Sequence, residues 1–224
     1  MSNPAQPQWT AVDGFLAEAL LPADPVLEAA LAASAAAGLP EIQVTPCQGR
    51  FLQVMAQLLQ SRNILEVGTL GGYSTIWLAR ALGPEGRLVT LELDPRHAQV
   101  ARANIERAGL APRVELRVGP ALETLPRLAA EGLGPFDFIF IDADKTSTPE
   151  YFSWALKLSR PGSLIVVDNV IRKGALIDSA STDPAVVGMR RFIKALAGQP
   201  GITATALQTV GSKGYDGFAI ALVR

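Results

Sequence analysis

The chain is 224 residues long and 49% hydrophobic, which is enough to bury one full core, so we expect a single domain over residues 1–224. Its formal net charge of −1 argues against a general nucleic-acid binder, because such proteins normally present a basic surface. The only cysteine, Cys47, and the only histidine, His97, exclude an internal disulfide framework and metal sites made of several cysteines or histidines.

The same composition bears on the cellular location. A chain with one cysteine is typical of a reducing compartment. Residues 1–49 contain no lysine or arginine and so lack the basic region that begins a secretory signal. Apolar runs such as Leu164–Val167 are far shorter than the roughly 20 residues that span a bilayer. We therefore expect a cytoplasmic protein that does not enter membranes.

Two helices are predicted within residues 1–40, after a frayed stretch at residues 1–8. Apolar residues recur at helical spacing from Trp9 to about Leu21. The pair Asp24-Pro25 then supplies an N-cap and a first helical residue for a second helix that stops at Gly38. These helices would cover the sheet or form a subunit contact, and because they are amphipathic and lack basic residues, we expect a homodimer.

From residue 49 onward, helical and strand patterns alternate. The first strand lies in the apolar run that begins at Ile64, and the last two β-rich segments, joined by the sequence GSKGYD, read as a hairpin. The other predicted strands are Arg87–Glu92, Val114–Val118, Phe136–Ile141 and Ser163–Val167, the hairpin strands are Ile202–Val210 and Gly217–Val223, and the predicted helices are Gly49–Leu59, Ser74–Leu82, Arg96–Ala108, Glu123–Ala130, Pro149–Leu158 and Ala185–Leu196. This order predicts an α/β fold with a seven-stranded, mostly parallel sheet, helices on both faces and an antiparallel strand near one edge.

The stretch Asn63–Thr75, NILEVGTLGGYST, organises the fold. It reads as a strand, a glycine turn and a helix, which is the ligand-binding corner of an open α/β sheet. The spacing of Gly68, Gly71 and Gly72 is G-x-x-G-G, and not the G-x-G-x-x-G that cradles a pyrophosphate. The turn therefore permits close approach of a ligand that need not carry phosphates, although many such turns are only tight corners.

Acidic and amide residues follow the other predicted strands, at the edge of the sheet where ligands bind in such folds. Each could be a helix cap or a turn residue on its own, but together they predict a site. Glu92 ends the second strand, where a carboxylate can accept hydrogen bonds from both hydroxyls of a ribose. Asp94 already fills the role of cap for the next helix, which weakens that alternative for Glu92.

A possible cation site follows the fourth and fifth strands. Asp142, Asp168 and Asn169 offer only oxygen ligands, which suit Mg²⁺, Ca²⁺ or Mn²⁺ and not zinc or copper. Lys145 can place an ammonium beside an oxygen bound there. A polar strand end with simple charge balance is the alternative explanation for these residues. His97 is expected to be an exposed helix residue, and Cys47 a small buried side chain and not a nucleophile.

Four motifs in this order, LEVGTLGGYSTIWLAR, LELDP, FIDADK and LIVVDNV, resemble the metal-dependent O-methyltransferases related to catechol and caffeoyl-CoA methyltransferases. The resemblance runs from about Ile42 to the C-terminus and implies a Rossmann-like methyltransferase fold. It implies that Asp142, Asp168 and Asn169 bind a divalent cation, with Mg²⁺ favoured, and that Lys145 and Asp142 are catalytic. It also implies S-adenosylmethionine bound by Val44, Glu66, Gly68, Thr69, Ser74, Glu92, Ala121 and Asp142.

The expected reaction is methyl transfer from S-adenosylmethionine to a hydroxyl of a catechol-like vicinal diphenol that is chelated to the cation. Three alternatives stay open. A metal-independent methyltransferase would share the cofactor site, an NAD-dependent oxidoreductase would share the ribose role of Glu92, and a sensor would bind the adenosyl ligand without turnover. The expected partners are a small phenolic substrate and a second copy of the chain, with no nucleic acid and no membrane.

Overall fold

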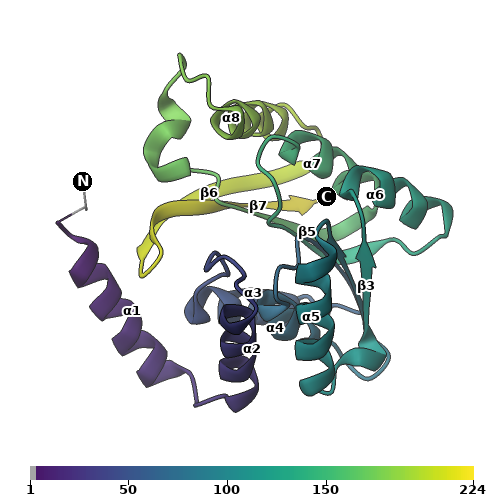
Figure 1. The fold of residues 1–224 in the computed structure, drawn as a ribbon. Helices are drawn as coiled ribbons and strands as arrows, with labels where there is room; N and C mark the ends of the chain where they lie inside the picture. Colours follow the sequence, from purple (N-terminus) through teal and green to yellow (C-terminus); the bar gives the residue numbers. More distant parts are fainter. Residues whose placement is uncertain (1–3) are drawn as a thin grey trace.

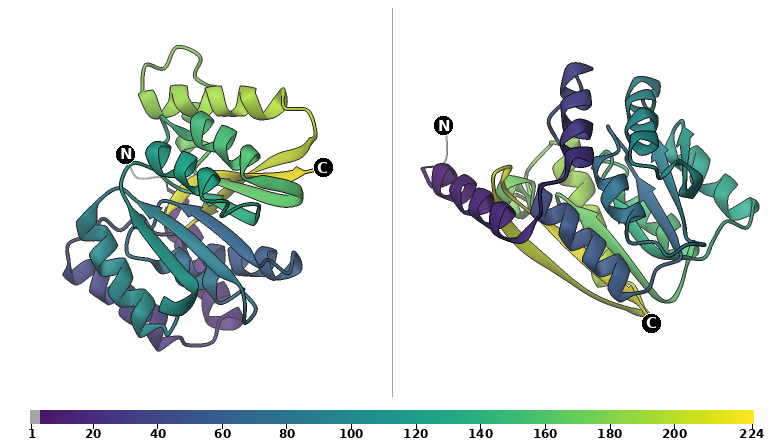
Figure 2. Two further views of the ribbon diagram at one scale, coloured as in Figure 1. Left: turned by 90° about the vertical axis from the view of Figure 1, so that its right-hand side faces the viewer. Right: turned by 90° about the horizontal axis from the view of Figure 1, so that it is seen from below.

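The computed structural model describes residues 4–224 and shows one twisted sheet with helices on both faces (Figures 1 and 2). The strand order across the sheet is β3-β2-β1-β4-β5-β7-β6. The first five strands run parallel to one another, and β7 is antiparallel to both of its neighbours. The strands are β1 (Asn63–Val67), β2 (Arg87–Glu92), β3 (Val114–Val118), β4 (Phe136–Ile141), β5 (Ser159–Asp168), β6 (Ile202–Gly211) and β7 (Gly214–Val223).

The helices divide into two layers that bury two apolar clusters. Helices α6, α7 and α8 pack on one face of the sheet, and α2, α3, α4 and α5 pack on the other. The helices are α1 (Gln6–Leu20), α2 (Pro25–Ala36), α3 (Pro46–Leu58), α4 (Tyr73–Ala79), α5 (Pro95–Arg107), α6 (Ala121–Ala130), α7 (Thr148–Lys157) and α8 (Pro184–Ala197), with short 3-10 helices η1 (Ala111–Arg113) and η2 (Arg172–Ile177). None of the helices in residues 4–224 is long and apolar enough to cross a membrane.

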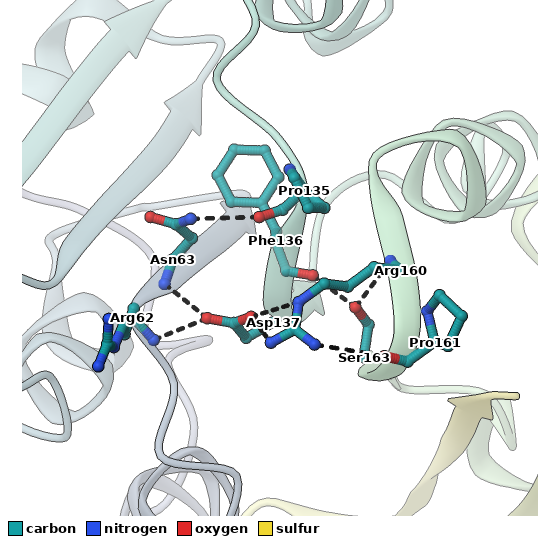
Figure 3. A network of polar contacts seen from close by, with 8 residues as sticks. All are labelled: Arg62, Asn63, Pro135, Phe136, Asp137, Arg160, Pro161 and Ser163. Atoms are coloured by element: carbon teal, nitrogen blue, oxygen red, sulfur yellow. Dashed lines mark hydrogen bonds and ion pairs between the residues drawn. The ribbon is translucent and has the colours of Figure 1, made fainter.

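Strand β4 is buried on both faces of the sheet, which explains why its sequence is almost entirely apolar. From Phe138 onward its residues alternate between the two clusters, with Ile139 on one face and Phe138 and Phe140 on the other. Phe136 lies before a register shift against β5 and belongs to the same cluster as Ile139. Asp137 is the exception, and it lies at the start of the strand. Its carboxylate accepts hydrogen bonds from the amides of Arg62 (2.7 Å) and Asn63 (2.9 Å) and from the guanidinium of Arg160 (2.6 Å), as Figure 3 shows.

The N-terminal helix α1 lies at the margin of the molecule, where it contacts α3 and strand β6 (Figure 2). None of its residues is buried, and it contacts the turn between β6 and β7. There the amide of Gln6 donates to the carbonyl of Gly211 (2.9 Å), and the carboxylate of Asp13 accepts from the amide of Ser212 (2.7 Å). Of the two predicted N-terminal helices, α2 packs against α4 and α5, whereas α1 contacts α3 and strand β6.

Several predicted element bounds were wrong at their ends. Residues 6–8 are helical and not frayed, whereas residues 1–3 lie outside the described part of the chain. Helix α3 begins at Pro46 and not at Gly49, because Thr45 is its N-cap and its hydroxyl accepts from the amide of Gln48 (3.2 Å). Strand β5 begins at Ser159 and not at Ser163. Strand β7 begins at Gly214 and not at Gly217, since the hairpin turn is confined to the two residues between β6 and β7.

Candidate active site

The glycine corner after β1 lies against the end of β4. Gly68 has a φ of +98°, and a Cβ at this position would lie 2.2 Å from the carbonyl oxygen of Asp142. Gly72, with a φ of +82°, is the N-cap of α4. A side chain at either position would be strained, and at Gly68 it would also push the two strand ends apart. The glycines therefore bring the turn and the predicted cation site together.

Glu66 is fully buried beneath this corner. Its carboxylate accepts hydrogen bonds from the hydroxyls of Ser74 (2.6 Å), Thr75 (2.5 Å) and Thr90 (2.7 Å). Burial raises the pKa of Glu66 to about 7 although these hydroxyls act in the opposite direction, and the negative charge of Asp142 adds to the increase. Both carboxylate oxygens thus already accept hydrogen bonds from the protein, and Glu66 holds the residues of the glycine corner in place.

A cavity of about 800 Å³ opens along the carboxyl ends of the parallel strands. Its size is in the range of sites for cofactors and small ligands. Glu66 and Asp168 are buried and do not line it, whereas the other predicted site residues do. Those lining residues are Val44, Gly68, Thr69, Ser74, Glu92, Ala121, Asp142, Lys145 and Asn169.

At one end of the cavity, Glu92 is held by backbone amides. One carboxylate oxygen accepts from Thr69 (3.1 Å) and Leu70 (2.7 Å), and the other accepts from Asp94 (2.9 Å). His97 also lines the cavity, with Nδ1 3.6 Å from the carboxylate of Glu92. The prediction that His97 is simply an exposed helix residue was wrong, because α5 begins at the cavity wall and its first turn faces Glu92.

At the other end lie the predicted cation ligands. Lys145 Nζ lies 2.6 Å from Asp142 Oδ1. Asp168 is 5% exposed, and its carboxylate accepts from the side-chain amide of Gln48 (2.8 Å) and from the backbone amide of Asn169 (2.7 Å). Burial and the neighbouring charge of Asp142 raise the pKa of Asp168 to about 7. The negative charge of Asp142 therefore lies close enough to disfavour the ionised form of Asp168.

This arrangement fits a hard divalent cation. Across residues 4–224, no group of three or more His, Cys, Asp or Glu side chains converges, so a site here must combine the two carboxylates with the amide oxygen of Asn169. Those donors are all oxygen atoms, as Mg²⁺, Ca²⁺ and Mn²⁺ prefer. A cation would also add positive charge beside the two carboxylates, which otherwise have only the ammonium of Lys145 next to them among the described residues.

Sequence reasoning missed several residues of this end. Gln48 was missed because its partner Asp168 is 120 positions away in the chain. The pair Tyr151 and Asp144 also lines the cavity, and the phenol donates to the carboxylate at 2.5 Å. Burial, followed by the hydrogen bond to Asp144 and then by the charge of Asp144, raises the pKa of Tyr151 above its ordinary range. At Gly188 a Cβ would lie 2.2 Å from the carbonyl oxygen of Lys145, so a glycine in α8 admits the lysine-bearing loop.

Comparison with known proteins agrees with this geometry. The family model described as O-methyltransferase matches residues 21–221. The chain is 57% identical to a catechol O-methyltransferase of Niastella koreensis over 216 residues, which cover 96% of this chain and 98% of the relative. It is 56% identical to a catechol O-methyltransferase of Mycobacterium tuberculosis over 224 residues, covering all of both chains.

Solved structures give the same answer. An O-methyltransferase from Bacillus cereus in complex with SAH superposes with a TM-score of 0.97 at 57% identity, covering 98% of this chain and 100% of the other. An O-methyltransferase of tomaymycin synthesis from Streptomyces achromogenes, in complex with SAM, superposes with a TM-score of 0.95 at 50% identity, covering 100% and 99%. The predicted fold and the predicted O-methyltransferase activity are confirmed, and the chain belongs to the O-methyltransferase family.

Proposed function

We propose that the protein transfers the methyl group of S-adenosylmethionine to one hydroxyl of a catechol-like vicinal diphenol. The reaction would require a divalent cation, with Mg²⁺ favoured. One observation carries the proposal. Lys145 Nζ lies 2.6 Å from Asp142 Oδ1, in a cavity that also contains Glu92 and Asn169. A single space thus offers a carboxylate for a ribose, oxygen donors for a cation and an ammonium for an acceptor oxygen.

The residues around the glycine corner would bind S-adenosylmethionine, which supplies an electrophilic methyl group when bound. Glu92 would accept hydrogen bonds from the ribose, with Ala121 beside it on the cavity wall. Val44, Gly68, Thr69 and Ser74 would contact the rest of the cofactor. Glu66 would act through Ser74, because its carboxylate accepts the Ser74 hydroxyl and fixes it at the cavity wall.

Asp142, Asp168 and Asn169 would hold the cation, which lowers the pKa of an acceptor hydroxyl when bound. A free phenol, with a pKa of about 10, is a poor nucleophile at neutral pH. The ammonium of Lys145 would stabilise the anionic oxygen as it forms, or its amine would accept the proton. Holding donor and acceptor in line would contribute about 7–11 kcal/mol, so positioning rivals activation of the nucleophile.

The test compares a vicinal diphenol, its two monomethyl ethers and a matching monophenol, with labelled methyl donor and Mg²⁺. We expect rapid single methylation of the diphenol and slow reaction of the other three, because only the diphenol offers two unhindered oxygens. The reaction should stop in EDTA and recover when Mg²⁺ is restored. Comparable rates for all four acceptors, or full activity in EDTA, would contradict the proposal and favour a metal-independent methyltransferase.

We also propose that the chain, as one catalytic domain, forms a homodimer in the cytoplasm through α1. Val12, Phe15 and Leu20 of this helix are 50%, 68% and 70% exposed, although each is a large apolar residue. An unpartnered apolar helix is typical of a surface that associates. The single cysteine suits a reducing compartment. Light scattering should give twice the monomer mass at micromolar concentration, and a monomer mass would contradict the dimer.

A further inference from the structure

The loop that follows β5 has an unusual backbone. Three of its non-glycine residues, Asn169, Arg172 and Lys173, have positive φ angles of 56°, 53° and 56°. L-residues rarely adopt this conformation, and where they do, the surrounding structure must hold them there. Such backbone concentrates at functional sites. Asn169 and Arg172 both line the cavity, so this backbone presents two polar side chains to a ligand.

The start of β7 fixes this loop. One carboxylate oxygen of Asp216 accepts from the backbone amides of Ile171, Arg172 and Gly217, each at 3.0 Å. The amide of Val170 donates to the carbonyl of Gly217 at 2.9 Å. Strand β7 therefore holds the backbone of Arg172 in place by hydrogen bonds. The position of Arg172 relative to Asn169 does not depend on a ligand.

The charge of Arg172 is not paired within the described part of the chain. Among the described residues that line the cavity, Lys145 is the one lysine and Arg172 the one arginine. Lys145 pairs with Asp142, whereas Arg172 makes no ion pair with any carboxylate of residues 4–224. Its Nε is buried and has no hydrogen-bond partner. A buried donor without a partner is costly, and it indicates a group that binds something absent from the protein itself.

A carboxylate is the ligand that suits such a group. Guanidinium is planar and always charged, and its fork of N–H donors matches a carboxylate with two parallel hydrogen bonds. Arg172 lines the same cavity as Asn169 and belongs to the same loop, three residues further along the chain. We propose that Arg172 binds an anionic substituent of the acceptor, and that the favoured acceptors are vicinal diphenols that carry a carboxylate. This inference rests on the proposed function and names its substrate class.

The test uses three acceptors of similar shape, namely 3,4-dihydroxybenzoate, 3,4-dihydroxybenzamide and catechol. The wild-type protein should methylate the benzoate with a kcat/KM at least about tenfold above that of the amide, because a charge-assisted pair is replaced by a weaker hydrogen bond. Arg172→Gln should lower kcat/KM for the benzoate by about 10- to 100-fold and change the other two by less than about threefold. Arg172→Lys, which keeps the charge but loses the fork, should fall between.

Lys173→Gln is the matched control, because Lys173 is the next residue, also has a positive φ, and is exposed and absent from the cavity wall. It removes the same charge and should leave all three acceptors unchanged. The affinity for S-adenosylhomocysteine should be equal in all variants. A loss of that affinity in Arg172→Gln would assign the guanidinium to the cofactor carboxylate instead, and an equal loss for benzoate and amide would also overturn the proposal.

A binding measurement separates this inference from the proposed function. Calorimetry with S-adenosylhomocysteine and Mg²⁺ present should show tighter binding of the benzoate than of the amide, and Arg172→Gln should abolish the difference. If no diphenol is methylated but this preference is seen, the proposed reaction fails while the carboxylate site stands. If diphenols are methylated without any preference for the benzoate, the carboxylate site fails while the proposed reaction stands.

Discussion

Two buried aspartates on adjacent strands behave in opposite ways. Asp137 is the second residue of β4 and Asp168 is the last residue of β5, and they are 7% and 5% exposed. Burial would raise the pKa of Asp137, but the amides of Asn63 and Arg62 and the guanidinium of Arg160 hold it below its ordinary value (Figure 3). The pKa of Asp168 instead rises to about 7, because burial and Asp142 outweigh the hydrogen bonds and the charge of Lys145.

The difference separates a structural carboxylate from a functional one. Asp137 receives enough donors from its own protein to stay ionised, and it ties β4 to the segment before β1 and to β5. Asp168 receives fewer donors and lies beside a second carboxylate, so its charge is left for a ligand to neutralise. The two ends of one sheet thus use the same side chain for stability and for binding, and the number of donors supplied decides which.

The largest expected effect comes from Asp168→Ala. We expect kcat to fall by about 1000-fold, because the proposed cation loses a ligand. Affinity for S-adenosylhomocysteine should stay near that of the wild type, since most of the predicted cofactor contacts come from β1, β2 and β3. Turnover and calorimetry on the same preparation check both statements. The exposed Asp178→Ala is the control, and equal losses of turnover and cofactor affinity in Asp168→Ala would refute this division.

Glu66 sharpens the comparison, because its partners are neutral hydroxyls and burial raises its pKa from 4.5 to about 7. The folded protein keeps a proton that the unfolded chain releases, so this group lowers stability as pH rises from about 4.5 to 7. Glu66→Gln should remove that slope. Relative to the wild type, the variant should gain about 3 kcal/mol between pH 4.5 and pH 8. Denaturant unfolding at both pH values measures it, and parallel pH profiles would show that the prediction is wrong.

Asp137→Ala should do the reverse of Asp168→Ala. Loss of the carboxylate leaves the partly buried amides of Arg62 and Asn63 and the guanidinium of Arg160 without their acceptor, so the free energy of unfolding should fall by about 2 kcal/mol. Turnover per folded molecule should not change, because Asp137 lies at the opposite edge of the sheet from the cavity. Urea unfolding and active-site titration supply the two numbers. A variant of wild-type stability with reduced kcat would reverse the roles assigned to the two aspartates.

The smallest effect is expected from Gln48→Ala. The amide of Gln48 donates to Asp168 Oδ2 at 2.8 Å and orients a carboxylate that the proposal gives to the cation. We expect the Mg²⁺ concentration for half-maximal activity to rise by about tenfold, as for other groups that orient metal ligands. Activity at saturating Mg²⁺ should recover most of the way. Gln48→Glu, which adds a charge instead of a donor, provides the contrast, and an unchanged Mg²⁺ requirement in Gln48→Ala would exclude the role.

Much of the fold follows from local patterns in the sequence. The bounds of β2, β3 and β4 were predicted correctly, because continuous apolar or alternating runs end where the chain must turn. Asp24 and Asp94 were correctly predicted as N-caps, since a carboxylate before a proline satisfies free amides within the next few residues. The motifs at the strand ends were enough to predict the family. Each of these signals depends on residues that are near one another in the chain.

What only the tertiary structure decided is how those residues meet. Gln48 and Asp168 are separated by 120 positions, and no local pattern pairs them. His97 faces the cavity because of where α5 begins on the sheet, and the guanidinium of Arg172 has no ion-pair partner within residues 4–224, because the nearby carboxylate of Asp216 is bound by backbone amides. The pKa values of Asp137 and Asp168 diverge for the same reason. Burial, neighbouring charge and hydrogen-bond supply are properties of packed surroundings, and long-range packing is what a sequence read alone leaves open.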